Sequence, residues 1–128
     1  MVSARAILIM FNFERLDCWH NGIEFADLVY DITRSFPSEE RFGLTNQMRC
    51  AAVSVSSNVA EGCSRASASD YARFVEIAAG SLFEVVSQAF IARKRGFLDE
   101  EGFRRIYTAG ERLGRMLSGL RQSLLNTR

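Results

Sequence analysis

The chain has 128 residues, of which 48% are hydrophobic and 24% charged, and its formal net charge is +1. These values are typical of one globular domain with a sizeable core, and they exclude linkers and low-complexity tracts. Three cysteines without a CxxC pair exclude the usual disulfide framework of secreted domains and favour free thiols in a reducing cytoplasm.

Residues 1–12 are expected to form an N-terminal tail, and residues 13–128 the folded domain. The short apolar run that ends at Met10 faintly resembles a signal peptide, but no convincing small-residue cleavage site accompanies it. A disordered or loosely packed tail, or a start site assigned too far upstream, explains this run better than export. No later segment approaches the roughly 18 uncharged apolar residues of a membrane span, so no membrane partner is expected.

The first predicted helix covers residues 16–36 and ends before Pro37, which cannot continue the hydrogen-bond ladder. Its apolar residues fall on two faces, and its acidic residues occupy the gap between them. One face holds Trp19, Ile23, Ala26, Tyr30 and Thr33; the other holds Phe25, Leu28, Val29, Ile32 and Phe36. Such a helix must be covered twice, either by two neighbouring helices or by another subunit.

The second predicted helix covers residues 45–64, with Thr45 as its N-cap. It consists almost wholly of small side chains, which lets a neighbouring backbone approach closely. Apolar residues recur at helical spacing, whereas strict alternation fails at residues 51–53. Its β-branched residues leave a strand over residues 52–59 as the alternative.

The third predicted helix covers residues 69–95, with Ser67 or Ser69 as its cap and Gly96 just beyond its end. The fourth begins after Asp99 and runs to about residue 125, with a regular apolar stripe. Four helices joined by short connections predict an all-α fold, an antiparallel up-down-up-down four-helix bundle.

Polar residues form a strip along the second helix. The strip holds Ser54, Ser57, Asn58 and Glu61. Buried polar groups need hydrogen-bond partners, so this strip is interpreted as a polar seam that ties packed helices together. A ligand site is the less favoured alternative.

Positive charge is concentrated near the C-terminus. Residues 93–128 hold nine basic and four acidic residues, whereas residues 1–92 hold seven and eleven. All basic residues except Lys94 are arginines, which suit phosphate contacts, although genomic base composition gives the same bias. Four arginines of the last helix fall in one arc opposite its apolar stripe. The candidate nucleic-acid-binding residues are Arg93, Lys94, Arg95, Arg104, Arg105, Arg112 and Arg115; a solvated helix face is the alternative.

No residue pattern indicates catalysis. His20 is the sole histidine, and no cysteine lies in a recognisable nucleophile motif. Di-metal sites in bundles use Glu-x-x-His pairs, which His20 does not form. Glu61 and Glu84 are the acids expected to be at least partly buried, with Glu61 paired to an arginine such as Arg49 or Arg65. No catalytic residue, metal ligand or cofactor is therefore predicted.

Residues 51–62, with the sequence AAVSVSSNVAEG, closely resemble the 23S rRNA intervening-sequence proteins of bacteria. They are more distantly similar to the accessory variability determinants of diversity-generating retroelements. The resemblance spans residues 13–125, and further supporting residues are Trp19, Phe36, Pro37, Gly43, Leu44, Thr45, Gln47, Arg49, Arg65, Phe74, Ala79, Gly80, Ser81, Glu84, Gly96, Phe97 and Leu98. The family usually has proline where this chain has Ser56, which predicts a straighter helix here.

The resemblance implies an up-down-up-down bundle that assembles into a cyclic homo-oligomer, most often a pentamer. It implies a cytosolic protein without enzymatic activity. Family members are linked to nucleic acid through gene location inside rRNA intervening sequences, and the retroelement relatives bind nucleic acid and a reverse transcriptase.

The sequence therefore predicts a non-enzymatic, ring-forming protein that binds RNA or DNA backbone through its last helix. The alternative is a protein–protein interaction scaffold that binds a protein partner and no nucleic acid. In either case the expected partner includes the chain itself. The residues expected at the subunit interface are Phe25, Leu28, Ile32, Phe83 and Phe90.

Overall fold

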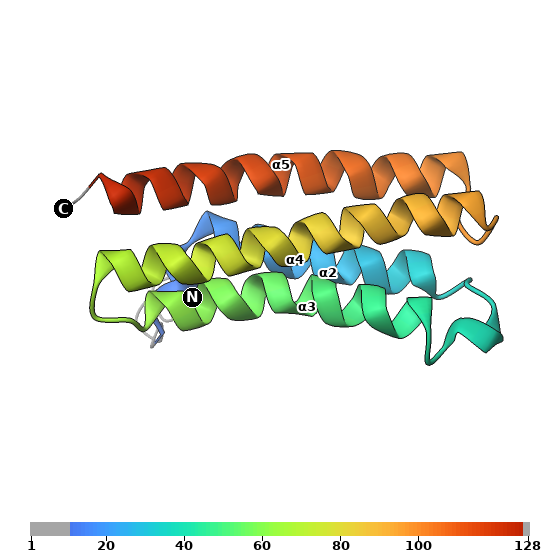
Figure 1. Cartoon of the computed structure of the whole chain (residues 1–128), viewed down its shortest axis with the longest axis horizontal. Helices are drawn as coiled ribbons and strands as arrows, with labels where there is room; N and C mark the ends of the chain where they lie inside the picture. Colours follow the sequence, from blue (N-terminus) through green and yellow to red (C-terminus); the bar gives the residue numbers. More distant parts are fainter. Residues whose placement is uncertain (1–10, 127–128) are drawn as a thin grey trace, which may run out of the picture.

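The computed structural model describes residues 11–126, and every regular element in that range is helical. Two short 3-10 helices (η) and four long α-helices follow one another along the chain (Figure 1). They are η1 (Asn12–Arg15), α2 (Asp17–Thr33), η2 (Ser38–Glu40), α3 (Leu44–Cys63), α4 (Ala68–Lys94) and α5 (Glu100–Leu125). The predicted all-α four-helix bundle is confirmed, and the strand alternative for residues 52–59 is wrong.

The four α-helices surround one core in chain order. α3 packs against α2 and α4, α5 packs against α4, and α2 also contacts α5 and so closes the bundle. In Figure 1 the chain runs left to right along α2 and α4, and right to left along α3 and α5. The diagonal helix pairs make no close backbone contact. Each helix therefore has one face toward the core and two flanks against neighbours.

The core lies along the axis where the four helices meet. Every α-helix supplies at least one of its largest fully buried side chains, which are Met48, Leu82, Ile106, Leu113, Leu117, Val29, Val55, Val59, Val75 and Val85. α3 contributes mostly small ones, and Ala51 and Ala52 are also buried. A Cβ added to Gly22 of α2 would lie 3.1 Å from the Cβ of Ser56 on α3. The small residues of α3 thus permit the close helix contact that the sequence predicted.

One apolar face of α2 meets the core, instead of the two that the sequence predicted. Its buried residues are Cys18, Gly22, Phe25, Ala26, Val29 and Thr33. This face lies between the two predicted ones, so Ile23 and Tyr30 at its edge are exposed. Arg49 of α3 covers part of Tyr30, with its guanidinium 4.6 Å from the ring centroid, and donates a hydrogen bond to Thr33 Oγ1 at 2.9 Å.

The helix ends match the predicted caps except at α3. Ser67 Oγ accepts from Asp70 N at 3.0 Å, and Asp99 Oδ1 accepts from Gly102 N at 2.8 Å. Gly96 has φ +81 after α4 and donates to Arg93 O, a backbone conformation that favours glycine. Thr45 is wrong as a cap because it lies buried inside α3.

The N-terminus of α3 is capped from the preceding turn. Glu40 Oε1 accepts a hydrogen bond from Leu44 N at 3.0 Å, and Gly43 is the residue before the helix.

Near the start of the described range, Asn12 lies in η1 and its side chain donates to Cys63 O at 3.1 Å. Residues 11 and 12, assigned to the tail from the sequence, therefore belong to the fold; residues 1–10 lie outside the described range.

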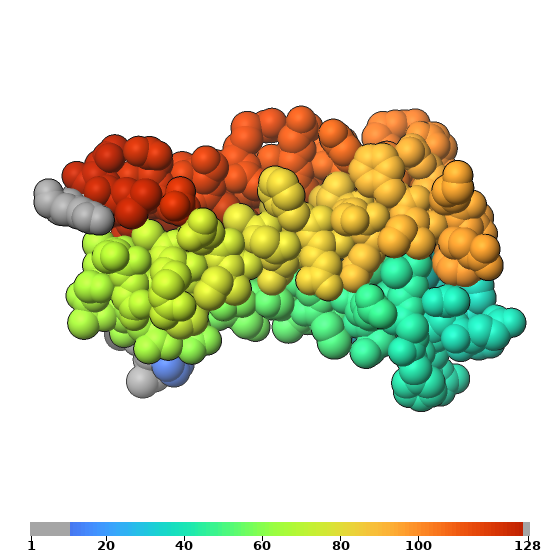
Figure 2. Space-filling view, in the orientation of Figure 1, coloured from blue at the N-terminus to red at the C-terminus, as the bar shows by residue number. Residues whose placement is uncertain are grey.

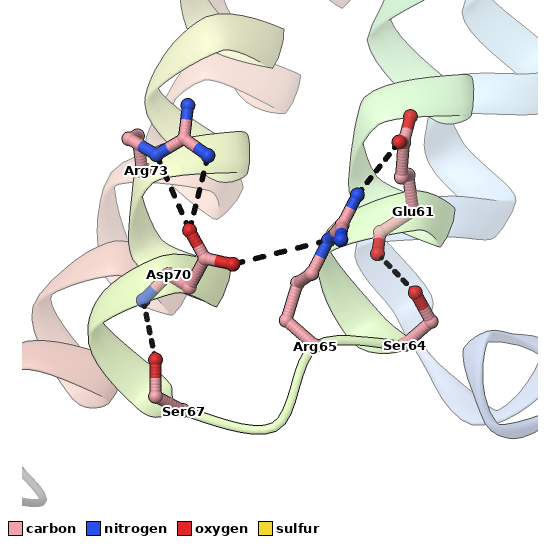
Figure 3. Close-up of polar contacts among 6 residues, drawn as sticks. All are labelled: Glu61, Ser64, Arg65, Ser67, Asp70 and Arg73. Carbon is pink, nitrogen blue, oxygen red and sulfur yellow. Dashed lines mark hydrogen bonds and ion pairs between the residues drawn. The ribbon is translucent and has the colours of Figure 1, made fainter.

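The connection between α3 and α4 is held by charged side chains (Figure 3). Arg65 reaches Glu61 at 2.8 Å and Asp70 at 4.0 Å, and Asp70 also binds Arg73 at 3.0 Å. Arg65 and Arg73 additionally lie 4.5 and 4.9 Å from the ring centroid of Phe74. The predicted pairing of Glu61 with Arg65 is confirmed, although Glu61 is exposed and not partly buried as expected.

α4 is long and apolar enough, by length and composition alone, to cross a membrane. Core helices of bundles pass the same test. In this chain the buried stripe of α4 packs against both α3 and α5, which accounts for part of its apolar character. The other part comes from the exposed side chains of Ile77, Phe83, Phe90 and Ile91.

Candidate nucleic-acid interface

α5 forms a ridge between two grooves. A groove of about 870 Å³ lies between α2 and α5 and is lined mainly by polar side chains, among them Glu24, Arg104, Arg105 and Arg112. A second groove of about 620 Å³ lies between α4 and α5 and is mainly apolar. Figure 2 shows α4, in lime to orange, and α5, in orange to red, side by side along the upper part of the molecule. The predicted basic residues are divided between these two sides.

Three arginines on the ridge are exposed and have no ion-pair partner within residues 11–126. They are Arg104, Arg105 and Arg112, and all three line the α2–α5 groove. The sequence allowed Arg104 and Arg105 to pair with Glu100 and Glu101, but no such ion pair forms. Their guanidinium groups therefore remain available for an external anion such as phosphate.

Arg115 lies on the other side of the ridge. It lines the α4–α5 groove, and its guanidinium is 3.9 Å from Glu111 of the same helix. Arg121 lines the same groove and is 3.8 Å from Glu76 of α4. Both contacts are long and exposed, so they hold these arginines only weakly. The arc predicted for the arginines of the last helix is thus divided between two grooves.

Arg93 is engaged within the chain. Its guanidinium lies 3.7 Å from the ring centroid of Phe103 and binds Glu100 at 3.2 Å. These contacts link the end of α4 to the start of α5. Lys94 is exposed, and Arg95 is exposed with its guanidinium 5.8 Å from the ring centroid of Phe97. Of the seven candidate residues, Arg93 makes the closest contacts within the described chain, so its guanidinium is the least available to an external anion.

The predicted polar seam contains only two of its four residues. Ser54 Oγ lies 2.9 Å from Ser81 Oγ of α4, and Asn58 Nδ2 donates to Ser54 Oγ at 2.9 Å. Ser57 and Glu61 are exposed instead, because they lie on the outer side of α3.

Gln88 extends the α3–α4 seam, and the sequence interpretation missed it. Gln88 Nε2 lies 3.3 Å from both Gln47 Oε1 and Glu84 Oε2, with Glu84 itself exposed rather than partly buried. The Gln88 Oε1 atom is buried without a hydrogen-bond partner among the described residues. The signal was available in the sequence, because Gln88 falls on the same side of α4 as Ser81 at helical spacing.

The residues predicted at a subunit interface differ widely in exposure. Phe25 is 2% exposed and part of the core, so its assignment to a subunit interface is wrong. Leu28 and Ile32 are half-buried beside α5. Phe83 is 74% exposed and Phe90 46% exposed, both on α4. The sequence interpretation missed Tyr107, an exposed aromatic side chain of α5 next to Phe90.

The remaining side chains that could take part in catalysis or metal binding, His20, Cys18 and Tyr71, make contacts within the fold or are buried. His20 Nε2 lies 2.7 Å from Glu14 O, and no group of three or more His, Cys, Asp or Glu side chains within residues 11–126 could hold a metal ion. Burial raises the pKa of the Cys18 thiol to about 11, which disfavours the reactive thiolate. Burial also raises the pKa of Tyr71, helped by its hydrogen bond with Cys63.

Comparison with known proteins adds one firm relationship. Residues 14–119 match the family model described as 23S rRNA-intervening sequence protein. No curated protein matches the chain. The matched span contains all four α-helices up to the last two turns of α5, and it includes the three unpaired arginines. The chain belongs to the 23S rRNA-intervening sequence protein family.

Proposed function

We propose that this chain is a non-enzymatic bundle protein that binds the backbone of RNA or DNA through the exposed ridge of α5. Arg104, Arg105 and Arg112 are its central contacts. Lys94, Arg95 and Arg115 widen the positive surface around them. The family's name connects it with 23S rRNA, which supports a role near nucleic acid.

One observation supports this proposal most strongly. Within residues 11–126, Arg104, Arg105 and Arg112 are exposed and lie more than 4.0 Å from every carboxylate. Arg105 and Arg112 are seven residues apart, which on an α-helix is two turns, or about 10 Å. A row of guanidinium groups at this spacing can contact successive phosphates without reading the bases.

We further propose an up-down-up-down topology and a cyclic homo-oligomer, most simply a pentamer, in the cytoplasm. The short connectors support the topology, and the family resemblance and the exposed Phe83 support the assembly. A ring repeats each basic ridge in every subunit, so the modest charge of one chain becomes a broad positive surface.

Removing the three free arginines tests the backbone contact. In Arg104→Ala/Arg105→Ala/Arg112→Ala, binding to a labelled single-stranded RNA should weaken. The plot of log affinity against log salt should become less steep, its slope less negative by about 2, because each of the three phosphate contacts contributes about 0.7. Fluorescence anisotropy across a salt series measures both quantities. Arg34→Ala, Arg73→Ala and a combination of the two are the matched controls, since both arginines already bind acids of their own helices.

The controls should retain the native affinity and salt slope. Native protein that binds neither single-stranded nor duplex RNA or DNA at low salt would contradict the proposal. So would a triple variant with an unchanged salt slope, because the contacts would then lie elsewhere.

A protein-interaction scaffold is the second candidate. The observation in its favour is Phe42, which is 86% exposed on the connector before α3. Within residues 11–126 its ring has one cation–π contact, with the Arg41 guanidinium 5.7 Å from the ring centroid. A protein partner that stays bound after nuclease treatment and is lost with Phe42→Ala would support this role. Loss of all partners under nuclease would contradict it.

A further inference from the structure

Phe90 of α4 and Tyr107 of α5 form an exposed aromatic pair across the outer side of these helices. Their ring centroids are 6.4 Å apart, and the rings are almost perpendicular at 79°. Phe90 is 46% exposed and Tyr107 43% exposed. Each ring therefore has surface available to a flat ligand.

The pair is supported from below by the buried ring of Phe103. Phe103 lies 4.8 Å from Phe90 and 5.8 Å from Tyr107, measured between ring centroids. Arg93 stacks on Phe103 and comes within 5.3 Å of the Phe90 ring centroid. Because Phe103 is packed in the core and Arg93 is fixed by Glu100, the two exposed rings rest on a rigid base. A rigid platform loses little conformational entropy when a ligand stacks on it.

Two exposed cations flank this pair. Lys94 follows Phe90 by four residues and lies on the same side of α4, whereas Arg104 precedes Tyr107 by three and lies one turn from it on the α5 ridge, where it also lines the α2–α5 groove. Neither has an ion-pair partner in the described part of the chain. Protein interfaces are enriched in aromatic side chains and arginine but depleted in lysine, whereas unpaired cations beside aromatic rings suit a polyanion with flat bases.

The α4–α5 groove continues from Tyr107 toward the other end of the molecule. Gly114 leaves the backbone of α5 open on this side, since among the described residues a Cβ there would meet only Leu82 Cδ2, at 3.5 Å. Gly110 is instead buried, with Val86 Cγ2 3.0 Å from the position of a Cβ. The groove is apolar along its floor, and at its far end Arg115 and Arg121 lie beside Glu111 and Glu76. A flat apolar base can enter the groove, and its phosphate is left to the unpaired cations beside the aromatic pair.

We propose that Phe90 and Tyr107 are a stacking platform for the unpaired bases of single-stranded nucleic acid, with Lys94 and Arg104 binding the adjoining phosphates. This inference rests on the proposed function and specifies its substrate class. A duplex hides the faces of its bases, so the platform makes the protein prefer single strands, loops or ends. It also assigns Phe90 to nucleic acid instead of the subunit interface.

Leucine substitutions test the platform because they retain apolar packing and remove the aromatic face. In Phe90→Leu/Tyr107→Leu, affinity for a labelled single-stranded RNA should fall about fivefold or more, since one stacked base contributes at least that much. Affinity for a blunt-ended duplex without unpaired bases and the salt slope should stay at native values, because the phosphate contacts remain. Anisotropy measures binding, and circular dichroism checks the fold.

Two variants serve as matched controls. Tyr107→Phe keeps the ring and should retain native single-strand affinity. Phe42→Leu removes a more exposed aromatic ring on the connector before α3, away from the platform, and should also retain it.

Four results would overturn the platform. The first is equal native affinity for a single strand and for a blunt-ended duplex without unpaired bases, and the second is a double variant with native single-strand affinity. The third is a double variant with a changed molar mass by light scattering, which would place both rings in a subunit interface. The fourth is absence of any binding by the native protein, which also refutes the proposed function, whereas the first three leave backbone binding intact.

Discussion

Cys18 is a residue whose ionisation is strongly tied to the fold. It is 7% exposed, and burial raises its pKa from 9.0 to about 11. The pKa of Tyr71 is also raised, chiefly by burial, and Cys63 and Cys18 add to the increase. The folded state therefore favours the protonated thiol and the protonated phenol. Charging either group requires a desolvated anion, so alkaline pH should weaken the bundle.

The stability contributed by the Cys18 thiol has a defined pH window. Its folded pKa is raised, so the contribution is fully present below the unfolded pKa near 9 and is lost as pH rises through about 11. Two pKa units correspond to about 2.7 kcal/mol. Between about pH 8 and pH 11 the free energy of unfolding should fall by about 2 kcal/mol more in the native protein than in Cys18→Ala. Urea unfolding at several pH values measures this difference.

Cys50→Ala is the control for this pH dependence, because the Cys50 thiol is exposed. It should retain the native dependence. Identical pH dependence in the native protein and Cys18→Ala would show that the Cys18 thiol titrates alike in the folded and unfolded states.

The free arginines could be predicted from the sequence only as members of a larger basic set. Helical spacing correctly placed Arg104, Arg105 and Arg112 on the outer side of α5. It could not separate them from Arg93, whose environment depends on how the end of α4 meets Phe103 and Glu100 of the next helix. Ion pairing between helices depends on the packing of both, which one helix's periodicity does not determine.

At the scale of helices, alanine substitution should affect stability differently at glycines in close helix contacts and at glycines on open surfaces. A Cβ on Gly62 of α3 would lie 2.8 Å from Phe74 Cβ and 3.2 Å from the Tyr71 carbonyl oxygen of α4. Among the described residues, no atom beyond Gly80's own neighbours and the nearby backbone of α4 lies within 4 Å of a Cβ on Gly80. Alanine favours the helix over glycine by about 1 kcal/mol wherever space permits it.

Gly62→Ala and Gly80→Ala should therefore shift stability in opposite directions. Gly62→Ala forces α3 and α4 apart and should lower the free energy of unfolding by about 1–3 kcal/mol. Gly80→Ala should raise it by up to about 1 kcal/mol. Thermal and urea unfolding followed by circular dichroism measure both changes. Stabilisation by both substitutions would mean that α3 and α4 are not in contact at Gly62.

Helix identity was predictable because the apolar periodicity and the caps agreed. Ser67, Asp99 and Gly96 mark ends that the structure confirms. The orientation of α2 was not predictable to the same degree, because its apolar residues cover a broad arc and Ile23 and Tyr30 resemble core residues in sequence. Only contact with α3 and α5 selects Phe25 and Val29 for the core. The wrong prediction of Thr45 as the N-cap of α3 has the same cause, because Glu40, which lies outside the helix, accepts the hydrogen bond from Leu44 N.

At the scale of the whole molecule, the bundle leaves the two flanks of α5 chemically different. The side toward α2 carries unpaired arginines beside Glu24 and Glu101. The side toward α4 carries aromatic and small residues, and its arginines are paired with acids. A nucleic acid on the ridge can thus have its phosphates over one flank and its bases over the other. Sequence reasoning found the ridge but not this difference, because a groove is made by the residues of two helices together.

The proposed assembly predicts a specific effect of a charge on α4. Phe83 is 74% exposed, more than any other large apolar side chain within the four α-helices. If it is covered by a neighbouring copy, Phe83→Asp places a carboxylate in an apolar contact, at a cost of several kcal/mol, and should lower the molar mass of the assembly. Light scattering after size-exclusion chromatography measures the mass.

Phe42→Asp is the matched control for assembly, because Phe42 is even more exposed but lies on a connector. It should leave the mass of the native oligomer unchanged. A native protein that is monomeric in dilute solution would contradict the ring. An oligomer unaffected by Phe83→Asp but dissociated by Phe42→Asp would place the subunit contact at the end of the bundle, where the α5 ridges of neighbouring copies could no longer combine into one surface.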